Sequence, residues 1–355
     1  MSVGSPCLKI FCEPIYENTR VISAIAKEHG ADVWGVTKGL CGAPEIGRIF
    51  VEGGCAGLAD SRLRNIKKQK EAGIRCKFLL IRIPMPHEMD ELTDVSDMAL
   101  ISCGRSIQLL EETCRIKKKN YDVIMMVEAG DLREGVMPCD LIAMKDQIKG
   151  LQRVRIAGVG ANFGCFGGIL PSEENISHVL MCARVVEEIA GRPMDIVSAG
   201  GTVCVPMLLE GRLARGVNHM RLGSAMLRGA IAWQPIERLR QDTLEFSATW
   251  AEIARKPSKP WGVQALDAFG HTPHFDDIGC RLRGILAAGR QDIYPEGIRP
   301  SDPGIKILGA SSDHLVCDIE DMLSVPDIGD QAIFQVNYAA MMTAATSEYV
   351  EKIFC

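Results

Sequence analysis

Eight short runs of β-forming residues alternate with longer, charged, helix-like segments between residues 32 and 221. This alternation is typical of repeated βα units around a parallel sheet. The predicted strands are 32–37, 55–59, 77–82, 97–102, 122–127, 154–161, 194–198 and 218–221, and the predicted helices include 44–52, 62–72, 105–119, 138–148 and 173–190. Eight successive units predict a closed (βα)8 barrel of the TIM type, with its chemistry at the carboxyl ends of the strands.

The sequence changes character at about Leu244, where Pro, Gly and β-forming residues replace the helical spacers. Strands are predicted at 256–263, 279–288, 304–308, 314–319 and 331–337, and a turn-rich surface loop at 292–304. We therefore expect an α/β protein with a barrel over residues 1–235, followed by a mostly-β C-terminal domain over residues 236–355. A first strand-like run, 7–12, is a candidate to pack with the C-terminal domain.

Composition excludes several classes of protein. A net charge of -5 gives no basic field for nucleic acid, and no apolar run reaches the roughly 18 residues of a membrane span. The fourteen cysteines have no regular spacing, and no secretory leader precedes them. These features predict a cytoplasmic enzyme with neither nucleic-acid nor membrane partners.

Lys38 follows the first predicted barrel strand and precedes a glycine-containing turn. A lysine desolvated at a barrel mouth loses its proton more easily, and an uncharged amine can form a Schiff base with an aldehyde cofactor. The alternative is that a lysine at a strand end simply reaches solvent. Spacing alone does not separate the two interpretations.

Two glycine-containing turns follow the seventh and eighth predicted strands. They are VSAGGTV at 197–203 and HMRLGSAMLRG at 219–229. Backbone amides with a hydroxyl and a cation suit a phosphate, and adjacent turns after strands seven and eight are a known phosphate-binding arrangement. Either turn alone is equally typical of an ordinary loop.

Nine segments in order resemble the fold-type III pyridoxal-phosphate enzymes, the family of alanine racemase, and within it the ornithine racemases. The segments are VTKGLCG (36–42), LADSRLRNIKK (58–68), EAGDLREG (128–135), GANFGCFGG (160–168), GVNHMRLGSAMLRG (216–229), LDAFGHTPHFDDIG (266–279), LAAGRQDI (286–293), LGASSDHLVCDIED (308–321) and NYAAMMTAATSEYVEK (337–352). The resemblance implies pyridoxal 5'-phosphate as the cofactor and a head-to-tail homodimer with shared active sites.

The resemblance also implies roles for individual residues. Lys38 matches the lysine that forms the internal aldimine and moves the substrate α-proton, which leaves a carbanionic intermediate. Arg221 matches the arginine that faces the pyridine nitrogen. The remaining cofactor contacts match Asn162, Gly201, Thr202, Gly223, Ser224 and Tyr338, and the substrate contacts match Arg133, Ser312 and Asp313.

Two departures from the family pattern bear on chemistry. Alanine racemase has a tyrosine as second acid/base where this chain has Arg290, so another group must serve the second face. The candidates are Cys280, Asp292, Asp313 and His314. Leu40 and Cys41 replace a glycine and tyrosine of the lysine motif, which removes one phosphate ligand.

The resulting hypothesis is a racemase that acts on ornithine or another diamino acid. The alternatives are a D-amino-acid lyase or dehydratase of the same fold and a non-catalytic protein that binds the cofactor. No metal is expected, because Val316 occupies the place of the second ligand after His314 and because His271 and His274 lie in a predicted turn.

Overall fold

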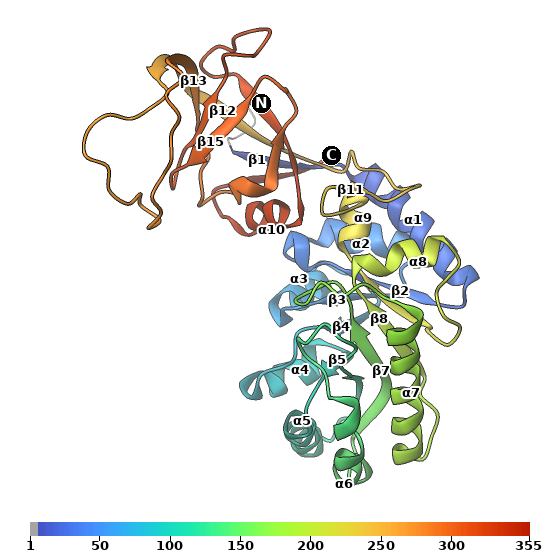
Figure 1. Cartoon of the computed structure of the whole chain (residues 1–355). Helices are drawn as coiled ribbons and strands as arrows, with labels where there is room; N and C mark the ends of the chain where they lie inside the picture. The colour runs from blue at the N-terminus through green and yellow to red at the C-terminus, as the bar shows by residue number, and fades with distance from the viewer. Residues whose placement is uncertain (1–5) are drawn as a thin grey trace. The chain divides into compact units, whose positions relative to one another are not determined.

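The computed structural model describes residues 6–355, which form two compact units (Figure 1). One unit contains residues 12–241, and the other combines residues 6–11 with 242–355. Residues 236–241 therefore belong with the barrel, six residues beyond the boundary expected from sequence. The reason is local: Asn18 donates a hydrogen bond to the carbonyl of Arg240 at 2.9 Å and accepts one from its amide at 2.7 Å.

The first unit is a closed barrel of eight parallel strands, as predicted. Each strand bonds to its successor, and β2 also pairs with β9, which closes the ring. The strands are β2 (Asp32–Val36), β3 (Gly57–Asp60), β4 (Lys77–Leu80), β5 (Met98–Ile101), β6 (Tyr121–Met126), β7 (Val154–Asn162), β8 (Ile196–Gly200) and β9 (His219–Leu222). A short hairpin of β10 (Ala230–Ile231) and β11 (Gln234–Pro235) follows.

Helices connect successive strands and surround the barrel (Figure 1). They are α1 (Cys12–Glu28), α2 (Pro44–Glu52), α3 (Leu63–Glu71), α4 (Met89–Val95), α5 (Gly104–Lys117), α6 (Lys145–Lys149), α7 (Glu173–Ala190), α8 (Val205–Leu209) and α9 (Ser224–Arg228). The helix predicted at 138–148 is instead two 3-10 turns, Pro138–Asp140 and Ile142–Met144, that lead into α6. No helix among the described residues is long and apolar enough to cross a membrane.

The barrel interior is filled mostly by apolar side chains. The buried cluster consists of Trp34, Val36, Ala59, Leu79, Met98, Leu100, Ile124, Met126 and Ala157. Strands β8 and β9 differ, because Ser198, His219 and Arg221 are polar and buried. His219 and Arg221 are two residues apart on one strand and so share a face. One wall of the barrel is therefore polar.

The second unit is built on an antiparallel sheet in the order β14, β17, β12, β13, β16 and β15. These strands are β12 (Leu244–Pro257), β13 (Cys280–Leu286), β14 (Ile298–Pro300), β15 (Lys306–Ala310), β16 (Leu315–Asp318) and β17 (Gln331–Val336), and one helix, α10 (Tyr338–Thr346), follows β17. The first strand, β1 (Cys7–Ile10), pairs antiparallel with β12 and parallel with β18 (Glu351–Phe354).

Two details of this unit differ from the sequence predictions. Of the strand predicted at 256–263, only residues 256–257 are in a strand, and they form the end of β12. The side chains that β12 buries, Phe246, Ala248 and Trp250, lie before the predicted range. The predicted surface loop 292–304 contains β14, and its residues Ile293 and Ile298 are buried. In both places burial of alternate apolar residues outweighs the local turn composition.

Candidate active site

Lys38 lies immediately beyond β2, at the first position of a 3-10 turn over Lys38–Leu40. The turn is tight: Cys41 has a left-handed backbone with φ of 53°. Gly42 follows at φ of 60°, and a Cβ there would lie 2.6 Å from the Cβ of Asn65. The sequence KGLCG therefore folds the chain sharply and leaves the lysine at the carboxyl end of the strand.

Burial lowers the pKa of Lys38 from its ordinary value of 10.5, and the nearby guanidinium of Arg133 acts in the same direction. Cys165, Asp60 and Glu134 act in the opposite direction, because negative charge favours the ammonium form. Desolvation is the largest of these effects. The geometry thus makes the uncharged amine more accessible than it is for a lysine in water.

A buried carboxylate holds the base of the lysine turn. Asp60, at the end of β3, is 0% exposed and accepts hydrogen bonds from Thr37 at 2.8 Å and Asn65 at 2.9 Å. Gln69 donates to the same threonine hydroxyl at 3.1 Å. Because Thr37 directly precedes Lys38, this network fixes where the lysine side chain begins.

Arg133 lies on the loop after β6 and forms an ion pair with Glu134. Its guanidinium also donates a hydrogen bond to the Cys165 sulfur on the loop after β7. Asn162, at the end of β7, donates to the Glu134 carboxylate at 2.5 Å. These polar side chains meet at the same end of the barrel as Lys38, as the predicted strand ends require.

Arg221 is buried inside the barrel, and burial lowers its pKa to about 10, so it remains protonated at neutral pH. It donates to Asn162 at 2.9 Å and to the carbonyl of Ala161 at 2.8 Å, and it also donates to the Ser198 hydroxyl. Ser198 in turn lies 2.6 Å from Nδ1 of His219. A continuous hydrogen-bonded path therefore runs from Arg133 through Arg221 to His219.

The two predicted glycine turns are in direct contact. The Thr202 hydroxyl accepts a hydrogen bond from the amide of Ala225 at 3.1 Å, which joins the turn after β8 to the start of α9. Gly201 has φ of 119°, and a Cβ there would lie 2.3 Å from the carbonyl oxygen of Phe163. A Cβ at Gly223 would lie 2.7 Å from the carbonyl oxygen of Val36. Because neither position has room for a side chain, the surface of each turn is formed by backbone atoms.

One further carboxylate organises the loops above the barrel. Asp131 is 3% exposed and accepts hydrogen bonds from the amides of Cys165 at 3.1 Å, Phe166 at 2.9 Å and Gly167 at 3.1 Å. It thereby ties the loop after β7 to the loop that presents Arg133. This residue and Asp60 lie within motifs visible in the sequence, although their bonding partners do not.

The predicted residues of the second unit fall into three places: one pair of loops, the far end of β13, and the start of α10. The loops 289–293 and 311–314 are bonded together, since Arg290 donates from its amide to the carbonyl of Ser311 at 3.0 Å. Asp313 accepts from Gln291 at 2.8 Å and from Ser312 at 2.8 Å. The same loop pair includes the positions of Asp292 and His314.

Cys280 is at the opposite end of β13 from this loop pair and is exposed. Tyr338 begins α10, whose N-cap is Asn337. Among residues 6–355 no cluster of three or more His, Cys, Asp or Glu side chains has the arrangement of a metal site.

Comparison with known proteins places this arrangement in a family. Residues 10–230 match the family model described as alanine racemase, N-terminal domain. The chain belongs to the alanine racemase family. It is 36% identical over 351 residues to a lysine racemase of Thermotoga maritima, covering 98% of each chain. It is 32% identical over 351 residues to an ornithine racemase of Acetoanaerobium sticklandii, covering 98% of this chain and 99% of that one.

Several solved structures have the same fold. The alanine racemase of Streptomyces lavendulae superimposes with a TM-score of 0.78 at 16% identity, covering 100% of this chain and 98% of that one. The D-threonine aldolase of Filomicrobium marinum gives a TM-score of 0.72 at 16% identity, covering 97% and 89%. The protein is thus a pyridoxal-phosphate-dependent amino-acid racemase with a barrel and a β-rich C-terminal unit.

Proposed function

We propose that this racemase interconverts the enantiomers of a free diamino acid, ornithine or lysine. The observation that supports this substrate class is the match over 98% of the chain to two racemases, one named for lysine and one for ornithine. The exposed loop with Asp313 adds a carboxylate that suits a distal ammonium group. Ser312 beside it would complete the substrate contacts of this loop.

The barrel residues fit pyridoxal phosphate. Lys38 would hold the cofactor aldehyde and move the α-proton on one face, because desolvation favours its uncharged amine. Gly201 and Gly223 leave a cradle that a Cβ would fill, so their turns, with Thr202 and Ser224, would hold the phosphate. When bound, the cofactor supplies an electron-withdrawing ring that acidifies the α-proton of the substrate.

Charged side chains around the cradle would orient the ring and the substrate. Arg221 is a permanent donor, held by Asn162 and Ser198, and would face the ring nitrogen without giving up its proton. Arg133 would bind the substrate carboxylate, because an arginine matches that group in charge and geometry. Tyr338, the first residue of α10, would contribute its hydroxyl to phosphate binding.

The proton donor for the second face would come from the loop pair 289–293 and 311–314. Asp292 is a weaker candidate because it is buried, with 7% of its surface exposed, whereas Asp313 is exposed; Cys280 is a weaker candidate because it is at the far end of its strand. Asp313 and His314 remain exposed on the loop. Separate Asp313→Ala and His314→Ala variants should distinguish them, since loss of the second proton donor slows α-proton exchange in one direction more than in the other.

The substrate class is tested with purified holoenzyme in deuterium oxide, by recording α-proton exchange and chiral chromatography for L-ornithine, L-lysine and L-alanine. We expect both diamino acids to exchange and racemise, L-alanine to do so at least tenfold more slowly, and Lys38→Ala to do neither. Faster turnover of L-alanine would contradict the proposed substrate class while leaving the racemase activity intact.

We further propose a head-to-tail homodimer in the cytoplasm, with each site completed by the partner chain. The test is subunit mixing of Lys38→Ala with Asp313→Ala protein. If Lys38 and Asp313 serve one site from different chains, half of the dimers regain one intact site, which restores about one quarter of wild-type activity. Absence of any recovery after verified subunit exchange would show that both residues act within one chain.

A further inference from the structure

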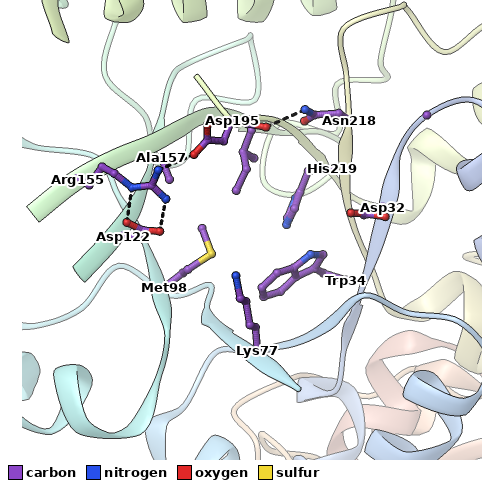
Figure 2. A pocket seen from close by; sticks show the side chains of 12 residues that line it. Asp32, Trp34, Lys77, Met98, Asp122, Arg155, Ala157, Asp195, Asn218 and His219 are labelled. Atoms are coloured by element: carbon purple, nitrogen blue, oxygen red, sulfur yellow. Dashed lines mark hydrogen bonds and ion pairs between the residues drawn. The ribbon is translucent and has the colours of Figure 1, made fainter. Parts of the chain in front are cut away.

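A polar cavity of about 350 Å³ opens at the amino-terminal ends of the barrel strands (Figure 2). Its lining includes Asp32, Lys77, Met98 and Asp122 at the beginnings of four strands. Lys38 and the glycine turns follow the other ends of their strands, so this cavity is distinct from the active site. Its volume lies within the roughly 300–1,000 Å³ typical of small-molecule sites.

The charged side chains around the cavity include more carboxylates than cations. Arg155 bridges Asp122 and Asp195, forming an ion pair with each. Lys77 and Asp32 are exposed at the same opening. Three carboxylates against two cations leave one net negative charge, which favours a ligand with one net positive charge. Behind them the wall is apolar, with Trp34 and Met98 buried.

One buried group in this cavity has a polar atom without a partner among the described residues. Nε2 of His219 neither accepts nor donates a hydrogen bond within residues 6–355, and the residue is buried, with only 3% of its surface exposed. Figure 2 shows its ring directed into the cavity, toward Trp34, with Lys77 beside them. A buried polar atom without a partner is costly, and a ligand atom at this position would remove that cost.

The hydrogen bonds behind His219 fix its tautomer. The Ser198 hydroxyl accepts from Arg221, which has no acceptor atom, so the serine proton is left to donate. Among residues 6–355, the hydroxyl contacts Arg221 and Nδ1 of His219, the latter at 2.6 Å, and of these two only Nδ1 can accept its proton. Nε2 therefore carries the ring proton. His219 presents an N–H donor to the cavity.

We propose that this cavity binds a second amino acid, one with a cationic side chain, at a site separate from catalysis. Its carboxylate would accept from Nε2 of His219 and from the Lys77 ammonium, and its cationic groups would lie toward Asp32 and the Asp122–Asp195 pair. The charges of the cavity favour such a ligand whichever substrate the active site converts.

Binding there has a path to the cofactor site. A carboxylate on Nε2 makes Nδ1 a stronger acceptor for the Ser198 hydroxyl, which in turn makes the serine oxygen a stronger acceptor for Arg221. The amino acid would thus change the electrostatic environment of Arg221 through two intervening side chains. A ligand in the cavity would therefore change the surroundings of the cofactor at the opposite end of the barrel.

The test uses holoenzyme whose cofactor has been fixed to the protein by borohydride reduction, so that no turnover occurs. Isothermal titration calorimetry with L-ornithine should show a site that Lys77→Met and Asp32→Asn each weaken at least tenfold, the loss expected for a charge-assisted hydrogen bond. The control variant Lys68→Met, at an exposed position on α3, should bind as wild type does. Fluorescence of the reduced cofactor should shift on binding.

Two fragments separate the parts of the proposal. Propionate supplies only the carboxylate and 1,4-diaminobutane only the ammonium groups, and each should bind at least tenfold more weakly than L-ornithine. Equal binding by wild type, Lys77→Met and Asp32→Asn would overturn the site. Propionate binding as tightly as L-ornithine would overturn the assignment to a cationic amino acid, and binding without a fluorescence shift would overturn the coupling to Arg221.

Discussion

The packing around Arg221 predicts the effect of adding one methyl group at Gly200. A Cβ at this position would lie 2.4 Å from Nη2 of Arg221, 2.8 Å from Oδ1 of Asn162 and 2.9 Å from Cζ of Arg221. Restoring a separation of 3.0 Å from Nη2 requires a shift of about 0.6 Å, the difference between the two distances. Nη2 makes the bonds to Ala161 and Asn162, so Gly200→Ala strains both of them.

Overpacking a core costs about 1–3 kcal/mol, and a weakened hydrogen bond to a charged group costs a similar amount. We therefore expect Gly200→Ala to lower the free energy of unfolding of the apoprotein by about 2–4 kcal/mol, together with weaker cofactor binding. Urea denaturation followed by circular dichroism measures the first quantity, and equilibrium dialysis of pyridoxal phosphate measures the second.

Gly309→Ala is the matched control, because no atom lies within 4 Å of its added Cβ. Its change in unfolding free energy should stay within about 0.5 kcal/mol. If Gly200→Ala matched this control in both measurements, the inferred contact with Arg221 would be refuted.

Three other perturbations follow from the same structure. Burial lowers the pKa of Lys38 below its unfolded value of 10.5, so between the folded and unfolded pKa values the unfolded apoprotein binds more protons, and its stability rises with pH. Lys38→Met should flatten this rise, measured as the urea midpoint against pH, and should stabilise the apoprotein at neutral pH. Burial lowers the pKa of His219 from 6.5 to about 3, so stability should fall as pH drops through that interval, and His219→Gln should reduce the slope. Asp131→Asn should speed amide exchange at 165–167 about tenfold or more in mass-spectrometric hydrogen exchange, because three amides lose a charged acceptor; unchanged exchange would contradict this.

The barrel could be predicted from the sequence because each strand is a short apolar run bounded by charged or turn residues. Helices α2 and α7 begin and end as predicted because Pro44 occupies the first turn of one and Ser172 caps the other. Helix α10 was not predicted, since its residues are nearly all small or apolar and give no amphipathic pattern. Strand β12 was mostly missed because burial in a sheet of distant strands decides its length.

Some residues of the candidate site could also be predicted from the sequence, and others could not. Lys38 and Arg221 are detectable because they occupy strand ends or motifs that a linear sequence displays. The partners that hold them are not: Asp60 contacts Thr37 across 23 positions, and Ser198 contacts Arg221 across 23. Such pairs are brought together by the register between neighbouring strands, which no local pattern encodes. The same holds for the contact of Cys165 with Arg133.

The placement of β1 has a consequence for how the chain is made. This strand, formed by residues 7–10, lies between β12 and β18, so both of its neighbours are synthesised at least 230 residues later. The whole barrel sequence is therefore synthesised while β1 still has no partner strand, and β18 is synthesised only with residues 351–354. A chain that ends a few residues early would keep its barrel but leave one edge of β1 open to another polypeptide. Synthesis of the chain through residue 354 is thus a condition for forming the complete sheet of the second unit.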